Sequence, residues 1–197
     1  MKRPFCGSLF LPWAVLLSSL LYGCRLEDRF IFHPDHVISR TPSDIGVPFE
    51  DISFTTSDGV HLSGWFIPRA DARTTLVWFH GNAGNISDRL LNIKLLHENI
   101  RSHIFIFDYR GFGRSEGRVS EEGTYLDGEA AIRYLLKRAE PQSGGIVLFG
   151  RSLGAAVAAE TATRFDCLGL ILESPFVSIS EMARAIFPSL PIASLLQ

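Results

Sequence analysis

A serine between two glycines, directly after an apolar run, is the part of the sequence with the clearest chemistry. The stretch from Phe149 to Ala156 reads FGRSLGAA and places Ser152 between Gly150 and Gly154. A serine hydroxyl is a weak nucleophile unless a sharp strand-to-helix turn holds it in the open beside a base, and small flanking residues make room for that turn. The pattern therefore predicts a nucleophile for acyl transfer, with an accidental Gly-Ser turn as the alternative.

A serine nucleophile needs a proton acceptor, and every histidine of the chain precedes Ser152: His33, His36, His61, His80, His97 and His103. His80 opens the segment HGNAGN, residues 80–85, after an apolar run. Glycines there would let the backbone approach a ligand, and N–H groups near a helix start suit an anionic oxygen. A plain Gly-Asn turn is the alternative. The segment DYRGFGRS, 108–115, is interpreted as structural, with Asp108 pairing locally with an arginine and substrate binding as the alternative.

Continuous apolar runs indicate strands that are buried on both faces of a parallel sheet, here at residues 75–79, 104–107, 146–149 and 168–172. Apolar residues at helical spacing between them predict helices at 87–99, 124–138 and 152–164. Alternation before them predicts a hairpin at 49–55 and 60–67. We expect an α/β fold with a mostly parallel sheet and helices on both faces, whose ligands bind where strands end and helices begin.

The first 24 residues have the layout of a bacterial export signal, with basic residues at positions 2 and 3 and an apolar run over 9–21. The closing residues LYGC resemble a lipobox, which implies lipidation of Cys24 and an exported, membrane-anchored protein. An uncleaved signal anchor and a cytosolic hydrophobic start are the alternatives. We therefore expect a signal at 1–24, a polar, proline-broken tether at 25–48 and the folded domain at 49–197.

Composition excludes some function classes. The 197 residues carry a net charge of −2 and no basic run beyond the first three positions, so we expect no nucleic-acid binding. No His/Cys/Asp cluster has ligand spacing, so we expect no metal, and nothing in the sequence calls for a cofactor. Cys6 and Cys24 belong to the signal, which leaves Cys167 without an internal disulfide partner and predicts a small buried core residue.

Four ordered motifs, HGNAGN, DYRGFGRSEG, GRSLG and LESPF, each follow a predicted strand and together resemble the α/β-hydrolase family. The resemblance runs from about residue 49 to 197 and is closest to membrane-associated serine hydrolases, which include acyl-protein thioesterases and serine-aminopeptidase-like proteins. It implies that Ser152 is the nucleophile and that the backbone N–H groups of Asn82 and Leu153 form the oxyanion hole. It also implies supporting positions that shape the two loops: His80, Gly81, Gly150 and Gly154.

In this family the catalytic acid and then the histidine follow later strands. The sequence stops at Gln197 before either, so we expect a domain incomplete at its carboxyl-terminal sheet edge, with 168–172 unpaired on its outer side and hydrolysis weak or absent. Glu173 is a minor candidate for the acid. The expected substrate is an acylated small molecule or protein, whose pocket would involve 177–197. The alternatives are a non-catalytic lipoprotein module and a half-enzyme completed by a second chain at the free edge.

Overall fold

The computed structural model describes residues 32–138 and 144–175. The chain divides into two units, Met1–His33 and Pro34–Gln197, and the fold below is that of the second. The predicted signal at 1–24, with Cys24, and the segment 177–197 lie outside the described residues.

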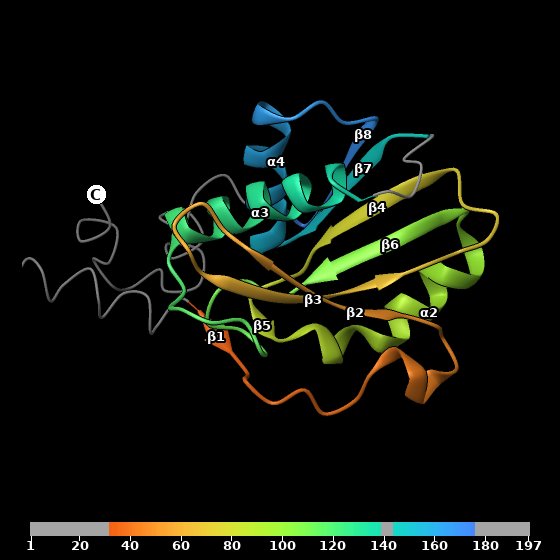
Figure 1. The fold of residues 1–197 in the computed structure, drawn as a ribbon, viewed down its shortest axis with the longest axis horizontal. Coiled ribbons are helices and arrows are strands. Elements are labelled where there is room, and N and C mark those ends of the chain that lie inside the picture. The colour runs from red at the N-terminus through yellow and green to blue at the C-terminus, as the bar shows by residue number, and fades with distance from the viewer. Residues whose placement is uncertain (1–31, 139–143, 176–197) are drawn as a thin grey trace, which may run out of the picture. The chain divides into compact units, whose positions relative to one another are not determined.

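A six-stranded sheet forms the centre of the domain (Figure 1), in the order β2-β3-β6-β4-β7-β8. β2 pairs antiparallel with β3, and β3 antiparallel with β6, whereas β6, β4, β7 and β8 run parallel. The sheet is thus mostly parallel, as the sequence predicts. The strands are β2 (Glu50–Thr55), β3 (His61–Ile67), β4 (Thr74–Phe79), β6 (Ser102–Phe107), β7 (Ile146–Arg151) and β8 (Gly169–Glu173). Two short strands, β1 (His33–Pro34) and β5 (Ala83–Gly84), lie outside this sheet.

Helices cover both faces of the sheet. Figure 1 shows α2 (Leu90–Asn99) on one face, with α3 (Glu121–Leu136) and α4 (Leu153–Arg164) on the other. Two 3₁₀ helices, η1 (Pro42–Ile45) and η2 (Ile86–Arg89), complete the regular structure of the described residues. This arrangement confirms the predicted α/β fold class, because long crossovers between parallel strands carry helices over both faces of a sheet.

Two predicted helices begin elsewhere than the apolar pattern indicates. α3 begins at Glu121 because the hydroxyl of Ser120 accepts a hydrogen bond from the Gly123 N–H and caps the helix. The segment predicted as one helix from position 87 opens as η2, in which the Asn85 side chain accepts from the Ser87 N–H, and continues as α2. Apolar periodicity does not reveal such polar caps.

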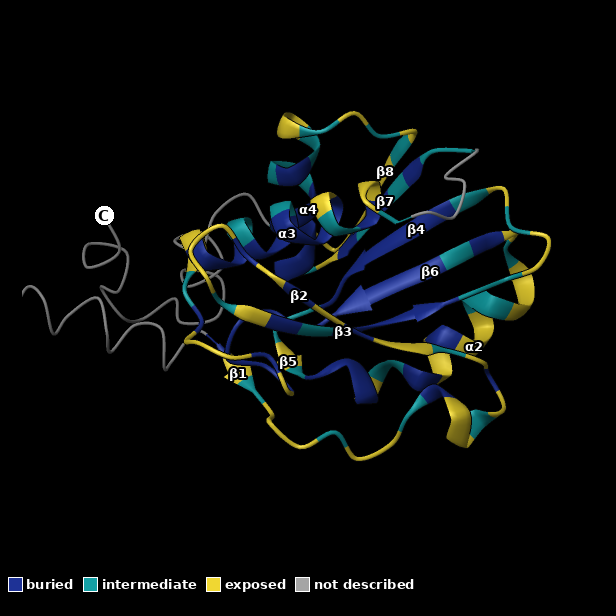
Figure 2. Ribbon diagram, viewed as in Figure 1, coloured by how far each residue is buried: buried dark blue, intermediate teal, exposed yellow. Residues whose placement is uncertain are grey.

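The sheet separates the core into two parts. One part consists mainly of aliphatic residues and tryptophan, and the other mainly of phenylalanine and tyrosine. Under α2, a buried cluster contains Trp65, Trp78, Ile93 and Ile106, each with at most 1% of its surface exposed. On the other face, phenylalanine rings of β2 and β6 pack against Tyr134 of α3 at centroid distances of 5.4–5.7 Å. Figure 2 shows the central strands β4 and β6 almost wholly buried. Their burial holds the carboxyl ends of the parallel strands rigidly in one place.

Part of the segment predicted as a tether packs against the domain. Val47 is 4% exposed and belongs to the cluster under α2. The Asn85 side-chain amide donates hydrogen bonds to the carbonyls of Asp35 (3.2 Å) and Val37 (2.8 Å). The packed chain in this unit therefore begins upstream of position 49.

The last described strand differs in exposure from the other parallel strands. β8 pairs with β7 alone among the described residues, and its side chains Leu170, Ile171 and Leu172 are 39%, 52% and 38% exposed. The prediction that Cys167 is a core residue is wrong, because it precedes this exposed strand and is only partly buried, as a free thiol.

A buried arginine ties the loop after β6 to two other elements. The Arg110 side chain is 8% exposed; its Nε donates to Asp127 Oδ1 on α3 (2.8 Å), and its other nitrogens bind Asp58 in the turn between β2 and β3. Burial raises the pKa of Asp127 to about 6, against the opposing effect of the hydrogen bonds from Arg110. Hydrogen bonds from Arg110 and then Thr56 lower the pKa of Asp58 to about 2.

The low pKa of Asp58 predicts a pH-dependent contribution to stability. A carboxyl group whose pKa falls on folding stabilises the fold above its ordinary pKa, and the contribution is lost as pH falls from about 4 to about 2. Because this side chain is 40% exposed, we expect Asp58→Asn to lower the free energy of unfolding at pH 7 by only about 1 kcal/mol, with roughly half of the difference left at pH 3. Urea denaturation at both pH values measures this. The exposed Asp166→Asn is the control, and a pH-independent difference would contradict the prediction.

Candidate active site

Ser152 lies at the sharp turn between β7 and α4. Its backbone has φ 54° and ψ −116°, a region that residues other than glycine rarely occupy. The turn is held from both sides, since the Ser152 N–H donates to the Glu173 carbonyl (2.9 Å) and its own carbonyl accepts from the Ala155 N–H (2.9 Å). Surrounding structure must over-determine such a strained conformation, and strain of this kind concentrates at functional sites.

The glycines on either side allow backbone contacts that no side chain would permit. A Cβ built on Gly154 would lie 1.9 Å from the carbonyl oxygen of Phe79, at the end of β4, and 2.7 Å from that of His80. A Cβ on Gly150 would lie 2.2 Å from the carbonyl oxygen of Gly154. The start of α4 therefore packs directly on the backbone that enters the loop after β4.

The structure brings the two predicted loops together at Ser152. A Cβ built on Gly81 would lie 3.8 Å from the Cβ of Ser152 and 3.5 Å from the Arg151 carbonyl oxygen. Asn82 follows Gly81 in this loop, and Leu153, 6% exposed, begins α4, where backbone N–H groups carry the positive end of the helix dipole. The assignment of the Asn82 and Leu153 N–H groups to an oxyanion hole stays a prediction.

His80 is fully buried and points into the core of its own loop. Its Nδ1 lies 2.8 Å from the Gly81 carbonyl oxygen, and its Nε2 lies 3.5 Å from Asp108 Oδ1. The ring packs on Tyr109 and Phe112 with centroids 4.6 and 5.5 Å away, and the Tyr109 hydroxyl donates to the His80 carbonyl (3.0 Å). These contacts suit a residue that shapes the loop rather than a base for Ser152.

The predicted pairing of Asp108 with an arginine is wrong. Asp108 is fully buried and faces His80, while its Oδ1 accepts a hydrogen bond from the Ile86 N–H (2.9 Å). Arg110 pairs instead with Asp58 and Asp127. Both residues lie beyond the end of β6, where Asp108 faces the loop after β4 and Arg110 faces α3 and the turn between β2 and β3, so the two side chains do not meet. Asp108 thus joins the end of β6 to both ends of the loop after β4.

Glu173, the minor candidate for the acid, ends β8 next to the turn. Its carboxylate is 46% exposed and lies 3.4 Å from the Nε of Arg151. Among residues 32–138 and 144–175, no histidine forms a hydrogen bond or an ion pair with this carboxylate. At the site, Glu173 contributes the backbone carbonyl that accepts a hydrogen bond from the Ser152 N–H.

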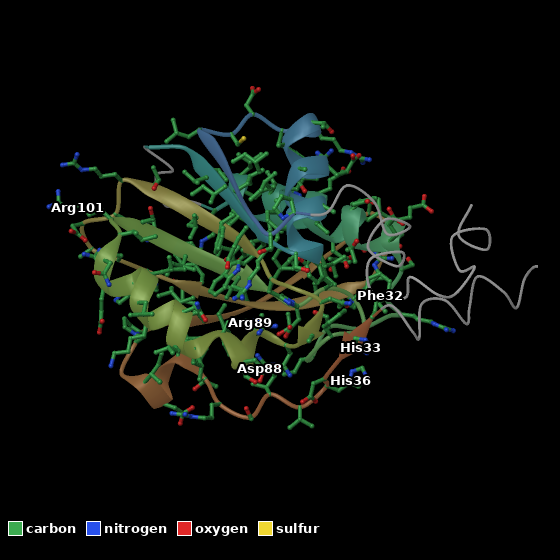
Figure 3. All side chains as sticks on the ribbon, turned by 180° about the vertical axis from the view of Figure 1, so that it is seen from behind. Phe32, His33, His36, Asp88, Arg89 and Arg101 are labelled. Atoms are coloured by element: carbon green, nitrogen blue, oxygen red, sulfur yellow. The ribbon has the colours of Figure 1, made fainter. Side chains whose placement is uncertain are left out.

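Sequence reasoning missed Arg89, which lies beside the loop after β4 (Figure 3). Its guanidinium donates a hydrogen bond to the Ala83 carbonyl, one residue beyond Asn82. Burial lowers the pKa of Arg89, and the nearby charge of Arg151 lowers it further, while Asp88 and Asp108 oppose this effect. An arginine in the 3₁₀ turn that follows a predicted loop offers no signal by itself, because its direction depends on packing.

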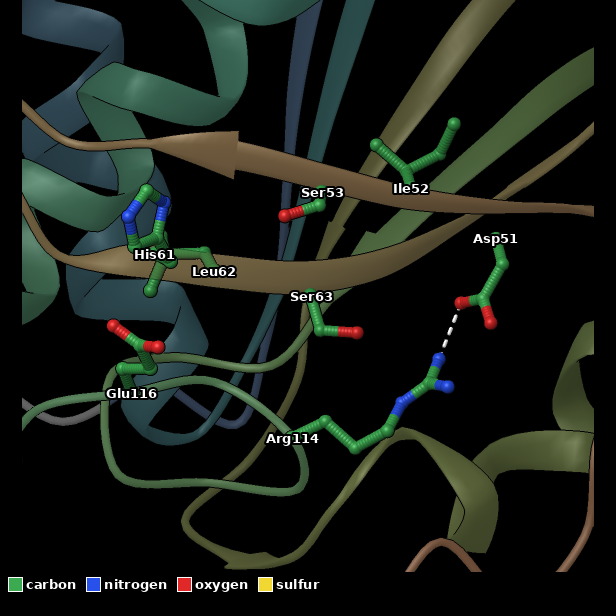
Figure 4. Close-up of a pocket in the computed structure, with 8 residues that line it drawn as sticks. All are labelled: Asp51, Ile52, Ser53, His61, Leu62, Ser63, Arg114 and Glu116. Atoms are coloured by element: carbon green, nitrogen blue, oxygen red, sulfur yellow. Dashed lines mark hydrogen bonds and ion pairs between the residues drawn. The ribbon is translucent and has the colours of Figure 1, made fainter.

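A cavity of about 420 Å³ opens elsewhere, against the β2-β3 hairpin (Figure 4). It is lined by Asp51, Ile52, Ser53, His61, Leu62, Ser63, Arg114 and Glu116. Ser152 does not line it, and the hydroxyls and charges that do are largely on the exposed side of the hairpin. Within the described ranges, no group of three or more His, Cys, Asp or Glu side chains could hold a metal ion.

The sequence of the chain matches a known family over most of the domain. Residues 70–196 match the family model described as serine aminopeptidase, S33. The chain belongs to the α/β-hydrolase family. The match confirms the resemblance to this family that the four motifs carry, and the mostly parallel sheet with helices on both faces agrees with it.

Proteins of similar sequence match most of this chain. YfhR of Salmonella typhimurium, an uncharacterized protein, is 37% identical, with 94% of this chain and 68% of the relative covered. An uncharacterized membrane protein of Saccharomyces cerevisiae, YNL320W, is 37% identical over 99% of this chain and 70% of its own length. The α/β hydrolase domain-containing protein WAV2 of Arabidopsis thaliana is 40% identical, and this chain spans only half of its length.

Among solved structures, the esterase Pf2001 of Pyrococcus furiosus superposes with a TM-score of 0.67 at 26% identity, covering 84% of this chain and 66% of the esterase. An α/β hydrolase from Vibrio vulnificus has a TM-score of 0.64 at 20% identity, over 94% of this chain and 66% of its own, which supports the α/β-hydrolase fold alone. In the part of the chain that the structure describes, none of the helices combines the length and apolar character needed to cross a bilayer.

Proposed function

We propose that this α/β hydrolase cleaves carboxylic esters or thioesters of acyl groups through an acyl-enzyme on Ser152. The observation that carries the proposal is the backbone of Ser152, which is held at φ 54° between a buried strand and a helix. Such a turn presents the hydroxyl at the end of the sheet, where the loop after β4 can meet the developing oxyanion. The esterase among the structural neighbours supports this reaction class.

The Ser152 oxygen would attack the substrate carbonyl carbon, and the carbonyl oxygen would become the oxyanion. The N–H groups of Asn82 and Leu153 are proposed to stabilise that charge. Expulsion of the alcohol or thiol leaves the acyl-enzyme, which water hydrolyses. The 197 residues include no histidine after Ser152, and His80 is buried against Asp108. We therefore propose that the turnover number of this chain by itself is about 10⁴- to 10⁶-fold lower than that of a chain with a complete triad.

A fluorophosphonate probe tests the nucleophile directly. We expect slow covalent labelling of the wild-type chain and none of Ser152→Ala, with the modified serine located by mass spectrometry. Ser174→Ala is the matched control, because Ser174 also has a positive φ (51°), follows β8 and is exposed. It should label like the wild type. Equal labelling of Ser152→Ala and wild type would overturn the proposal.

A second candidate is a half-enzyme that another polypeptide completes along β8. The exposed apolar residues of this strand, Leu170, Ile171 and Leu172, support it, because strand edges recruit further strands. The labelling experiment separates the two candidates. Serine-dependent labelling by the isolated chain favours the first, whereas a folded chain that reacts with no probe favours completion by a partner or a non-catalytic binding module.

A membrane tether through 1–24, with Cys24 lipidated and the protein exported, is part of the proposal. The basic start and the apolar run of residues 9–21 support it. A yeast relative is named a membrane protein, which agrees with membrane association. The substrate, in this proposal, is an acylated small molecule or protein that the tether keeps near the membrane.

A further inference from the structure

We propose that Arg89 and Arg151 form an anion-binding subsite beside Ser152, so that the substrate carries a carboxylate or phosphate close to the scissile ester or thioester. This inference rests on the proposed function of Ser152 and names its substrate class. The two arginines would act on specificity rather than on the bond-making steps.

The first observation is the position of the two guanidinium groups. Arg151 directly precedes Ser152 at the end of β7, and its side chain is 50% exposed. Arg89 lies in η2, at the far end of the loop after β4, and donates to the Ala83 carbonyl. Gly81 of that loop lies against Ser152 and the Arg151 carbonyl, so the two arginines belong to the two backbone segments that meet at the nucleophile.

The second observation is the incomplete compensation of Arg89. Among the described residues, no carboxylate lies within 4.0 Å of its guanidinium nitrogens, although the side chain is partly buried. Burial is the main cause of its lowered pKa, which Asp88 opposes more strongly than Arg151 adds to it. Asp88 and Asp108 oppose this at longer range, but the Asp88 carboxylate already accepts from the Asn85 N–H and Asp108 from the Ile86 N–H.

A partly desolvated guanidinium with no carboxylate in contact favours an anion beside it, and the positive charge of Arg151 adds to this preference. A neutral ester would not supply that compensation. Glu173 partly neutralises Arg151 from the solvent side, at 3.4 Å, and an exposed pair of this kind contributes little free energy. Arginine presents paired N–H donors that match carboxylate and phosphate oxygens, and the chemistry does not distinguish the two anions.

Matched ester pairs test the inference in the full chain. On the acyl side, phenyl hydrogen glutarate is compared with methyl phenyl glutarate; on the leaving-group side, 4-acetoxybenzoate and 4-acetoxyphenyl phosphate are compared with methyl 4-acetoxybenzoate. We expect kcat/KM, after subtraction of the Ser152→Ala rate, to be about tenfold higher for the anionic ester of the favoured pair. Arg89→Gln should remove that preference, with a loss of kcat/KM about tenfold larger for the anionic ester than for the neutral ester, and Arg89→Lys should retain part of the preference.

The control is Arg101→Gln, which should leave every rate unchanged. Arg101 precedes β6 and therefore lies at the opposite end of the parallel strands from Ser152, and Figure 3 shows it far from Arg89. Arg151→Gln should lower the preference less than Arg89→Gln, because Arg151 is more exposed. The preference should also fall as salt is added. Equal losses for anionic and neutral esters in Arg89→Gln would overturn the inference and leave Arg89 as a positioning residue for the loop through Ala83.

Binding to Ser152→Ala separates this inference from the proposed function. Calorimetric titration with phenyl hydrogen glutarate, 4-acetoxyphenyl phosphate and the neutral diester requires no turnover. At least tenfold tighter binding of one anion, lost in Ser152→Ala/Arg89→Gln, supports the subsite even if no ester is hydrolysed. The identity of that anion shows whether carboxylate or phosphate is preferred. Equal binding of anionic and neutral compounds would overturn the subsite even if Ser152 proves to be the nucleophile.

Discussion

Gly154→Ala is expected to destabilise the domain by about 3 kcal/mol or more and to remove the reactivity of Ser152 towards a fluorophosphonate. The added methyl group would overlap the Phe79 carbonyl oxygen at 1.9 Å and the His80 carbonyl oxygen at 2.7 Å. Both are backbone atoms at the end of a buried strand, so neither can turn away as a flexible side chain would. The start of α4 must therefore move away from β4.

That movement would separate the two halves of the candidate site. Ser152 and Leu153 travel with α4, whereas Gly81 and Asn82 belong to the loop that leaves β4. A small displacement is enough to disturb catalysis, because oxyanion stabilisation depends on donors placed about 3 Å from the charge. We therefore expect reactivity to fall even in the fraction of Gly154→Ala that folds.

Gly169→Ala is the matched control for this experiment, since a Cβ at Gly169 would have no atom within 4 Å. It should unfold in urea like the wild type or slightly later, and should label at the same rate. Urea denaturation and probe labelling of the three proteins measure both effects. Wild-type stability and labelling in Gly154→Ala would show that α4 does not pack on the β4 backbone as described.

The strands and the turn at Ser152 were predictable from the sequence because their signals are local. Strands buried on both faces are continuous apolar runs, and the turn is marked by glycines at fixed offsets from the serine. The fold class follows from the alternation of such strands with helical segments. The expectation that His80 shapes its loop came instead from the family resemblance, and its contacts with Gly81, Asp108 and Tyr109 agree with it.

The side-chain pairings around the site were not predictable because they join positions far apart in the chain. Arg110 contacts Asp58 across 52 positions and Asp127 across 17, and the structure alone shows that it turns away from Asp108. The packing of Val47 under α2 escaped prediction for a related reason, because single apolar residues among prolines have no periodicity. Arg89 likewise reaches the Ala83 carbonyl only through the path of the loop after β4.

Asp127→Ala is the second substitution for which we expect a large effect, a loss of about 3–5 kcal/mol in the free energy of unfolding at pH 8. The change leaves Arg110 buried with one carboxylate in place of two, and it removes the acceptor of the Arg110 backbone N–H (2.8 Å). We choose pH 8 because the pKa of Asp127 is raised to about 6, so its carboxylate is ionised there. Asp127→Asn, which keeps an oxygen acceptor, should lose less.

The effect should reach Ser152 through the loop that Arg110 anchors. Tyr109 and Asp108 precede Arg110, and they hold the His80 carbonyl and the Ile86 N–H at the two ends of the loop after β4. If Arg110 loses its anchor on α3, both contacts loosen, and we expect slower probe labelling in conditions where the variant is still folded. Glu122→Ala is the control, because Glu122 is an exposed residue of the same helix. It should change the free energy of unfolding by no more than about 0.5 kcal/mol and leave the rate of probe labelling nearly unchanged. Full stability in Asp127→Ala would mean that Asp58 alone compensates the buried guanidinium.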